Sequence, residues 1–165
     1  MSSTIVAPDI SVPLNYVQIA VHLGVGSKPH TIDDVQRLSH DGYTHILNVG
    51  DVDDTRVLGQ AAWIDCGIRG YLYNPTPDDG KAKPASWFAD SLAFALPLMR
   101  PRSGCLLYVH CYDGIDRGPS TAYCILRAVG FFQGDAAYAI RLRRPVAIMR
   151  YNSDAEYALE RLGYV

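Results

Sequence analysis

The apolar run CLLYVH, at residues 105–110, constrains the fold of this 165-residue chain more than any other segment. A strand with one face in water alternates apolar and polar residues, whereas a strand covered on both faces is apolar throughout. Strands of the second kind occur in parallel sheets that carry helices on both faces. The run therefore predicts an α/β fold in which it forms a central strand.

Strand-like and helical patterns alternate over the rest of the chain, as such a fold requires. Strands are expected at 15–26 (one or two of them), at 44–50, and within 61–73 around Tyr71–Tyr73. Helices are expected from Thr31 to near Gly42, at 85–101, after the loop that follows the apolar run, at 136–144 and at 152–163. We therefore expect a single compact α/β domain over residues 14–165, with a central, mostly parallel sheet flanked by helices. Residues 1–13 are expected to form a loose leader.

Single residues mark several of the expected helix ends. Thr31 and Asp34, three positions apart, form a capping pair at the start of the first helix. Asp135 is expected to cap the helix that follows it, and Pro145 to end that helix. Pro97 is expected to disturb the last turn of the helix that precedes the apolar run.

The composition argues against several classes of function. Hydrophobic residues make up 48% of the chain and charged residues 19%, as in globular proteins, and the formal net charge is -2. This charge argues against a general binder of nucleic acids or membrane surfaces. The longest apolar stretches are far shorter than the ~20 residues needed to span a bilayer, so no membrane insertion is expected.

The first residues and the cysteines indicate a compartment. The start, MSSTIVAPDI, lacks the basic residues and apolar core of a secretion signal, so we expect a cytoplasmic protein. The four cysteines follow no CxxC pattern, which suits free thiols in a reducing compartment. The five histidines show no metal-ligand spacing, so no metal site is expected.

The segment HCYDGIDRGPS, which begins at the end of the apolar run, has the features of an anion site. Cys111 stands at the carboxyl end of the expected strand, where ligands bind in α/β sheets. Pro119 marks the first turn of the next helix. The N–H groups of residues 112–117 can turn inward toward an anion beside the helix N-terminus, and Gly114 permits the tight turn that this needs.

A cysteine at the mouth of such a loop is stabilised as the thiolate, its reactive form. Arg117 would offer a planar, two-pronged donor to a phosphoryl group from the opposite side. The plainer interpretation makes Cys111 a small buried core residue and Arg117 a surface ion-pair partner. The strand, the glycine, the arginine and the proline-led helix occur together in the order that a site needs, which favours the chemical interpretation.

The pattern His110-Cys111-x-x-Gly114-x-x-Arg117 resembles the Cys-x5-Arg P-loop, the signature loop of the cysteine-dependent protein tyrosine phosphatase superfamily. The wider chain resembles the small dual-specificity branch of that superfamily. The segments that resemble family segments, in the family's order, are THILNV, YLYNPTPDD, SWFADSLAF, LLYVHC and RRPVA. The resemblance implies a compact dual-specificity phosphatase-like domain that hydrolyses phosphate monoesters without a metal or other cofactor.

The chemistry of the loop and the resemblance together suggest a mechanism. Cys111 would attack phosphorus in line and form a cysteinyl-phosphate intermediate. Arg117 and the N–H groups of the loop would hold the phosphoryl oxygens. The phosphate-binding loop would consist of Tyr112, Asp113, Gly114, Ile115, Asp116, Arg117 and Gly118.

The leaving oxygen also needs a proton, which only a nearby Asp, Glu or His can supply at neutral pH. In the family this acid is an Asp on a flexible loop some thirty residues before the cysteine. The matching segment is PTPDD, where Asp78 aligns best and Asp79 stays open as the alternative. The plainer interpretation of this pair is an ordinary acidic turn. His110 is expected to brace the loop from behind by hydrogen bonds.

Gly118 departs from the family pattern, which has Ser or Thr directly after the arginine. The missing hydroxyl would help to stabilise the departing thiolate, and losing such a bond costs ~1.5–3 kcal/mol, or a ten- to hundredfold slower step. Ser120 or Thr121 could replace it in part, although a hydrogen bond to the helix backbone is the plainer expectation for both. The family's Pro-Asn pair is also replaced, here by Met149-Arg150.

Two acids in the loop, Asp113 and Asp116, make it similar to the loop of myotubularin-type phosphoinositide phosphatases. Two negative charges at the rim nevertheless disfavour polyanionic substrates. Arginines near the pocket could offset this charge, although a solvated basic helix face is their plainer interpretation: Arg141, Arg143, Arg144 and Arg150.

We therefore expect a protein phosphatase that hydrolyses phosphotyrosine, with phosphoserine and phosphothreonine as further candidate substrates. Its partner would be a phosphorylated protein or peptide, no nucleic acid is expected, and a monomer is assumed. One alternative is a phosphatase acting on a non-protein phosphate, such as a phosphoinositide or an RNA end. The other is a weakly active phosphate-binding module, which Gly118 suggests.

Overall fold

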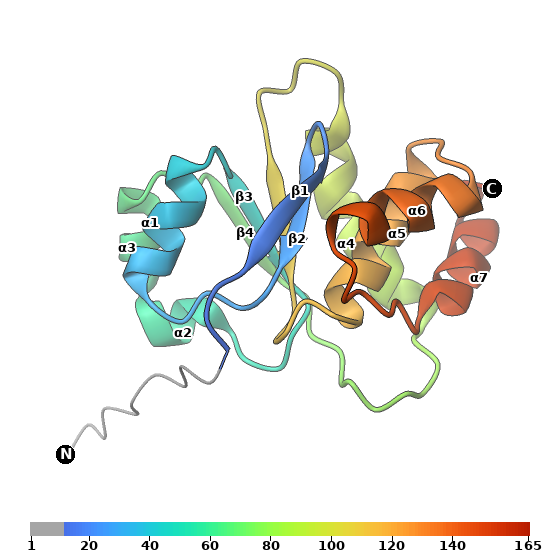
Figure 1. Cartoon of the computed structure of the whole chain (residues 1–165), viewed down its shortest axis with the longest axis horizontal. Helices are drawn as coiled ribbons and strands as arrows, with labels where there is room; N and C mark the ends of the chain where they lie inside the picture. Colours follow the sequence, from blue (N-terminus) through green and yellow to red (C-terminus); the bar gives the residue numbers. More distant parts are fainter. Residues whose placement is uncertain (1–11) are drawn as a thin grey trace.

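A five-stranded sheet runs through the middle of the molecule (Figure 1). The computed structural model describes residues 12–165, with the backbone alone at Val57. The strands are β1 (Tyr16–Ala20), β2 (Leu23–Gly26), β3 (His45–Asn48), β4 (Gly70–Tyr73) and β5 (Leu107–His110), in the spatial order β1-β2-β5-β3-β4. β1 pairs antiparallel with β2, and every other pair in the sheet is parallel. The leader expected at 1–13 lies outside the described residues except for its last two positions.

β5 is the central strand, and all four of its residues are buried. Because successive side chains of a strand point to opposite faces, Leu107 and Val109 enter one hydrophobic core, whereas Tyr108 enters the other. The neighbouring β3 divides its residues in the same way, with Leu47 in the first core and Ile46 in the second. The prediction of a central strand covered on both faces is confirmed.

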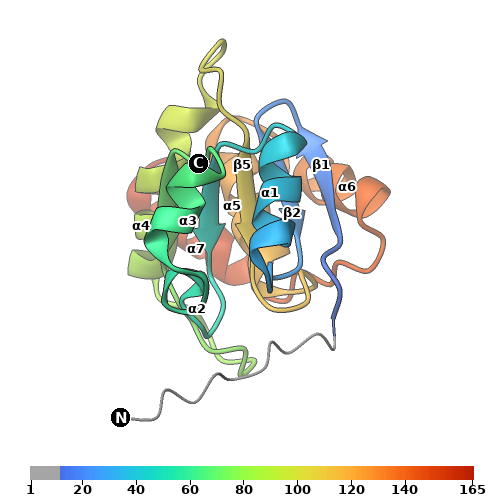
Figure 2. The same ribbon diagram turned by 90° about the vertical axis from the view of Figure 1, so that its left-hand side faces the viewer.

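Two groups of helices cover the sheet (Figures 1 and 2). On one face lie α4 (Ala85–Ala95), α5 (Arg117–Ala128), α6 (Gln133–Arg143) and α7 (Asn152–Leu162). On the other lie α1 (Ile32–His40), α2 (Asp54–Leu58) and α3 (Gln60–Asp65). The expected α/β domain with a mostly parallel sheet flanked by helices is confirmed. Among residues 12–165, no helix has the length and apolar character needed to cross a membrane.

Three of the predicted helix ends are confirmed, among them the one at Pro145, since α6 ends at Arg143. The Thr31 hydroxyl accepts from the N–H of Asp34, and the Asp34 carboxylate accepts from the N–H of Thr31, which makes the expected capping box. The helix α4 ends at Ala95 and tightens into a 3-10 turn, Leu96–Met99, that contains Pro97.

The cap predicted at Asp135 is wrong. α6 begins at Gln133, and the N–H of Ala136 bonds to the carbonyl of Phe132, so the first helical turn already includes Asp135. An acid inside the first turn is still favourable, because it faces the positive end of the helix dipole. The boundary lies earlier because the chain reverses at Gly130, with φ at +107°, and turns helical directly after Phe132.

Within residues 61–73, the strand expected around Tyr71–Tyr73 is confirmed as β4, whereas the first part of the segment is not a strand. Residues 60–65 form α3, in which Trp63 is buried in the second core while Ile64 is exposed. The apolar pair Trp63-Ile64 is too short to show a period, so the sequence pattern does not distinguish a helix from a strand here. The segment before α3 begins with α2, which Asp53 caps: its carboxylate accepts from the N–H of Thr55.

Candidate active site

The loop of residues 111–116 joins β5 to α5 at the carboxyl ends of the parallel strands, as the sequence predicted. Gly114 is its turning point, with φ at +68°, and a Cβ there would lie 2.3 Å from the carbonyl oxygen of Gly26. Both observations require glycine at this position, because any side chain would be strained and would clash with backbone.

Five consecutive carbonyl groups of the loop accept hydrogen bonds from its surroundings, at Cys111, Tyr112, Asp113, Gly114 and Ile115. Their donors are, in the same order, the His110 ring, the Lys28 N–H, Arg144 twice and the Ile148 N–H, at distances of 2.6–2.9 Å. In a trans peptide unit the C=O and the following N–H point in opposite directions. The N–H groups of residues 112–116 therefore point to the inner side of the loop, in the arrangement of a backbone nest, which in other proteins binds anions.

Arg144 is central to this arrangement. Its Nε donates to Gly114 O at 2.6 Å, and its Nη2 donates to Asp113 O at 2.9 Å and to Asn15 Oδ1 at 2.7 Å. The interpretation of Arg144 as part of a solvated basic face is wrong, since it is buried, and burial lowers the pKa of its guanidinium. Its neighbours Arg141 and Arg143 are exposed. Helical spacing would place Arg141 and Arg144 on one face. However, α6 ends before Pro145, so Arg144 leaves the helical conformation and its side chain points inward.

Cys111 is buried beneath the loop, next to the first turn of α5. A Cβ built on Gly118 would lie 3.5 Å from the sulfur and 3.3 Å from the backbone nitrogen of Cys111. The thiol therefore sits against the N-terminal turn of a helix, where the helix dipole favours negative charge. Pro119, in the same turn, removes an N–H that has no partner within the helix.

Arg117 is the first residue of α5; its side chain is buried and lines the same cavity as Cys111. Its Nη1 donates to Asp51 Oδ1 at 2.8 Å and to the carbonyl of Thr76 at 2.9 Å. Its Nε is buried without a hydrogen-bond partner among the described residues, 4.0 Å from Asp78 Oδ2. Burial opposes the charge of Arg117, but the hydrogen bond to Asp51 and the field of Cys111 outweigh it and raise the pKa of the guanidinium. The guanidinium is thus held at Nη1, and Arg117 lines the cavity together with Cys111.

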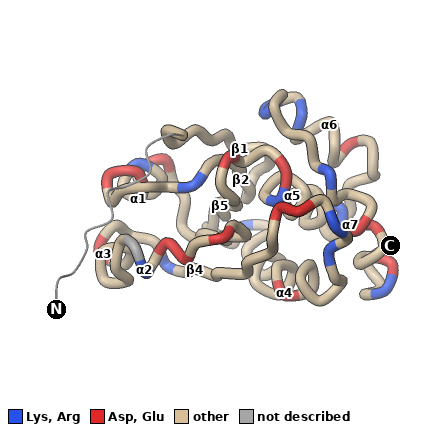
Figure 3. The backbone as a smooth tube through the Cα atoms, turned by 90° about the horizontal axis from the view of Figure 1, so that it is seen from below, with Lys and Arg blue, Asp and Glu red and all other residues tan. Residues whose placement is uncertain are grey.

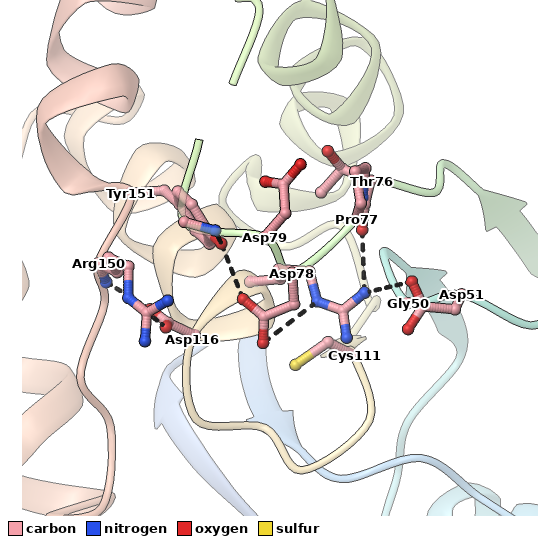
Figure 4. A network of polar contacts seen from close by, with 12 residues as sticks. Gly50, Asp51, Thr76, Pro77, Asp78, Asp79, Cys111, Asp116, Arg150 and Tyr151 are labelled. Carbon is pink, nitrogen blue, oxygen red and sulfur yellow. Dashed lines mark hydrogen bonds and ion pairs between the residues drawn. The ribbon is translucent and has the colours of Figure 1, made fainter. Parts of the chain in front are cut away.

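The two candidate acids lie differently, although they are adjacent in sequence (Figure 4). Asp78 lines the cavity together with Cys111, and its Oδ1 accepts from the Tyr151 hydroxyl at 2.8 Å. Asp79 turns away and pairs with Lys83 at 2.7 Å. The hydrogen bond from Lys83 lowers the pKa of Asp79, and so does the one from the N–H of Lys81. Only Asp78 is therefore placed to reach a group bound above Cys111.

His110 is fully buried behind the loop, as expected of a brace. Its Nδ1 lies 2.8 Å from Cys111 O, and its Nε2 lies 2.7 Å from Oδ2 of Asp54, which is also fully buried. Sequence reasoning missed Asp54, and likewise Asp51. Both belong to the acidic stretch that directly follows β3, and in α/β sheets the residue after a strand end is a signal for a site.

The hydroxyls inside α5 are engaged elsewhere. Thr121 Oγ1 donates to the carbonyl of Arg117 at 2.9 Å, which is the predicted bond to the helix backbone. Ser120 Oγ accepts from the N–H of Tyr151 at 3.2 Å, so it binds the segment before α7 rather than the backbone of α5.

The acids of the loop are not equivalent. Asp116 is buried, accepts from the N–H of Arg150, and pairs with Nε of Arg150 at 3.2 Å. Met149, where the family pattern has proline, adopts a left-handed conformation with φ at +59°, and the N–H that follows it points at Asp116. Asp113 is exposed at the rim. The rim therefore presents one unpaired acid of the loop to solvent and not two, since Arg150 neutralises the other.

Several of the side chains described above meet at a cavity above the sulfur of Cys111. It is lined by Asp78, Cys111, Tyr112, Asp113, Ile115, Asp116, Arg117, Ile148 and Arg150. Over residues 12–165, no group of three or more His, Cys, Asp or Glu side chains is arranged to hold a metal ion.

Comparison with known proteins finds solved structures with a similar fold. No family model and no curated protein sequence matches the chain. PTPMT1 in complex with PI(5)P superposes with a TM-score of 0.72 and 20% identity, over 89% of this chain and 98% of that one. Human DUSP28 gives 0.71 and 22%, over 92% and 97%, and a mouse putative dual specificity phosphatase complexed with zinc tungstate gives 0.68 and 17%, over 93% and 94%. The chain therefore has the fold of the cysteine-dependent protein tyrosine phosphatase superfamily, in the form of its small dual-specificity branch.

Proposed function

We propose that this protein is a phosphatase that hydrolyses phosphotyrosine in proteins through a cysteinyl-phosphate intermediate. The observation that carries the proposal is the set of donors gathered around Cys111: the inward N–H groups of residues 112–116 and the buried guanidinium of Arg117, which lines the same cavity. Donors fixed in this way stabilise charge on the equatorial oxygens of a phosphoryl group in the transition state.

In the first step, the sulfur of Cys111 would attack phosphorus as the thiolate, while the bond from phosphorus to the ester oxygen breaks. Asp78 would give its proton to that oxygen, so that the substrate leaves as the neutral phenol. In the second step, Asp78 would take a proton from water as the water attacks phosphorus. The S–P bond then breaks, the thiolate is regenerated, and inorganic phosphate leaves.

The lining of the cavity supports an aromatic monophosphate. Ile115, Ile148 and Tyr112 supply apolar surface beside the phosphate position, which suits a tyrosine ring. Asp113 at the rim and the acidic loops that meet at this end of the sheet oppose a headgroup with several phosphates (Figure 3). PTPMT1, whose structure contains PI(5)P, makes this phosphoinositide the appropriate competitor in a test.

The test has two parts. Hydrolysis of p-nitrophenyl phosphate without added metal is expected for the wild type and is expected to fall at least a thousandfold in Cys111→Ser, because a hydroxyl is a far weaker nucleophile than a thiolate. Release of phosphate from a phosphotyrosyl peptide is then expected to exceed release from PI(5)P under the same conditions. A folded, reduced wild type without activity on p-nitrophenyl phosphate would overturn the enzyme proposal. Faster release from PI(5)P would keep the enzyme and overturn the protein substrate.

A further inference from the structure

A hydrogen-bond chain runs into Asp78 from a residue that lies far from it in sequence. The hydroxyl of Tyr151 accepts from the N–H of Gly80 at 3.1 Å and donates to Oδ1 of Asp78 at 2.8 Å. Because the oxygen of Tyr151 already accepts from Gly80, its own proton is directed at Asp78. Tyr151 is only 2% exposed, so water has little access to compete for this bond.

The position of Tyr151 is fixed from two other directions. Its N–H donates to Ser120 Oγ in α5, at 3.2 Å. Its ring lies beneath the ammonium group of Lys83, with Nζ 4.7 Å from the ring centroid, which is a cation–π contact.

Lys83 holds the acid loop on both sides of Asp78. Its Nζ donates to the carbonyl of Pro77 at 2.5 Å and to Oδ1 of Asp79 at 2.7 Å, and its side chain is almost fully buried. The N–H of Lys83 in turn donates to Asp154 in α7 at 3.0 Å. The loop 76–80 is therefore bound to α7 and to the turn before it, and Figure 4 shows Asp78 directed at the space above Cys111.

The two carboxylate oxygens of Asp78 therefore have different roles. Oδ1 accepts from Tyr151, so a proton carried by the carboxyl group resides on Oδ2. Oδ2 is the oxygen that lies 4.0 Å from Arg117 Nε, on the side where a phosphoryl group would bind. A fixed donor oxygen avoids the loss of rate that a freely rotating side chain suffers.

We propose that Tyr151 is a positioning residue for the general acid: its hydroxyl, supported by Lys83, holds Oδ1 of Asp78 so that Oδ2 delivers the proton to the leaving oxygen. This inference rests on the proposed function, since it assigns a role within the same reaction. Nothing in the local sequence around Tyr151 points to it, because the residue comes more than seventy positions after the acid.

The test compares two substrates that differ in their need for an acid. Phenyl phosphate leaves as a phenol of pKa near 10, like tyrosine, and requires protonation, whereas p-nitrophenyl phosphate has an activated leaving group and requires little. Tyr151→Phe keeps the ring and its packing but removes the hydroxyl. We expect kcat/KM, which reports on the first step, to fall about ten- to hundredfold for phenyl phosphate and to change less than threefold for p-nitrophenyl phosphate.

Two further variants separate positioning from general damage. Added to Asp78→Asn, the Tyr151→Phe change is expected to have no further effect on phenyl phosphate, because both act through one proton transfer. Lys83→Met removes the ammonium group that supports Tyr151 and the acid loop, and it leaves Asp78 and Tyr151 unsubstituted. It is expected to reduce hydrolysis of phenyl phosphate selectively, as Tyr151→Phe does, but by a smaller factor. Tyr157→Phe, the same chemical change at an exposed position of α7, is the matched control and is expected to affect neither substrate.

The outcomes distinguish this inference from the proposed function. Equal losses on both substrates in Tyr151→Phe, or an additional loss on the Asp78→Asn background, would show a structural role and overturn the inference alone. If the folded wild type hydrolyses neither substrate, the proposed function and the inference fail together.

Discussion

Gly118 brings the backbone of α5 close to the sulfur of Cys111, at the position where the family pattern has a hydroxyl. A Cβ at this position would lie in ordinary contact with the sulfur of Cys111, at 3.5 Å, and its closest neighbour would be the nitrogen of Cys111, at 3.3 Å. Residue 118 is helical, so a serine meets no backbone strain there. A serine would bring its hydroxyl beside the sulfur, provided that the backbone at Cys111 shifts by a few tenths of an ångström to accept the new Cβ.

Gly118→Ser is expected to raise steady-state turnover of p-nitrophenyl phosphate about ten- to hundredfold if hydrolysis of the intermediate is limiting, because the hydroxyl stabilises the departing thiolate. Stopped-flow measurement should show an unchanged burst of p-nitrophenol followed by a faster linear phase. Gly118→Ala adds the Cβ without the hydroxyl and is the control. An equal gain in the alanine variant would contradict the role of the hydroxyl.

The choice between Asp78 and Asp79 shows where sequence reasoning ends at this scale. The two residues are adjacent in one loop, and the family pattern favours Asp78 but leaves Asp79 open. Lys83, four positions after Asp79, neutralises one acid, and Tyr151 orients the other. The partner of Asp79 is visible in the local spacing, whereas the partner of Asp78 comes from a remote segment and needs the folded structure.

Among the elements, the phosphate loop shows how backbone direction is set from outside. Arg144, at the end of α6, binds two carbonyls of the loop and the side chain of Asn15, which precedes β1. These bonds turn the corresponding N–H groups toward the cavity. The orientation of these N–H groups therefore depends on an arginine that does not line the cavity.

Arg144→Met is expected to raise KM for p-nitrophenyl phosphate at least tenfold and to weaken inhibition by inorganic phosphate, since two loop carbonyls lose their donors and the nest loosens. Unfolding in urea should show a loss of about 2–4 kcal/mol, because hydrogen bonds from a charged group contribute ~1.5–3 kcal/mol each and are not additive. Arg143→Met, at the exposed neighbour, is the control. Equal effects in the two variants would mean that net positive charge, not the hydrogen bonds, matters.

Element prediction succeeded where a physical requirement was strong and failed where the signal was short. The central strand follows from an apolar run, and the start of α1 follows from a reciprocal cap between Thr31 and Asp34. The helix at 60–65 has one buried aromatic residue, Trp63, and its period is not readable over six residues. The cap at Asp135 failed because residues 129–132 form a turn that places the helix start earlier.

For the whole molecule, the order of the strands assembles the site. β3 and β5 are neighbours, and β4 is beside β3, so Asp51, Asp78 and Cys111 arrive at one end of the sheet from three successive loops. Tyr151 and Arg150 come from the segment before α7. Because α7 packs on α4 and α5, the position of that segment depends on the helical layer as well as on the sheet.

An ion pair joins two helices of that layer. Arg127 in α5 donates to Glu156 in α7, with Nε 2.6 Å from Oε1, and the hydroxyl of Tyr123 donates to the same oxygen. Hydrogen bonds from Arg127, and then from Tyr123, lower the pKa of Glu156 from its ordinary 4.5 to about 2. The folded state therefore binds this proton less readily than the unfolded state, and the pair stabilises the fold above pH 4.5 and loses that effect as the pH falls toward 2.

Glu156→Gln is expected to reduce the free energy of unfolding at pH 7 by on the order of 2 kcal/mol, with a difference from the wild type that shrinks between about pH 5 and pH 2. Urea unfolding at pH 7, 5 and 3 measures this difference, and Glu160→Gln, at an exposed site of the same helix, is the control. A difference that stays constant with pH would place the stabilisation in packing and not in the charge of Glu156. Since Tyr151 immediately precedes α7, Glu156→Gln should also reduce kcat/KM for phenyl phosphate at pH 7 more than kcat/KM for p-nitrophenyl phosphate, which links the stability of the helical layer to the position of the acid.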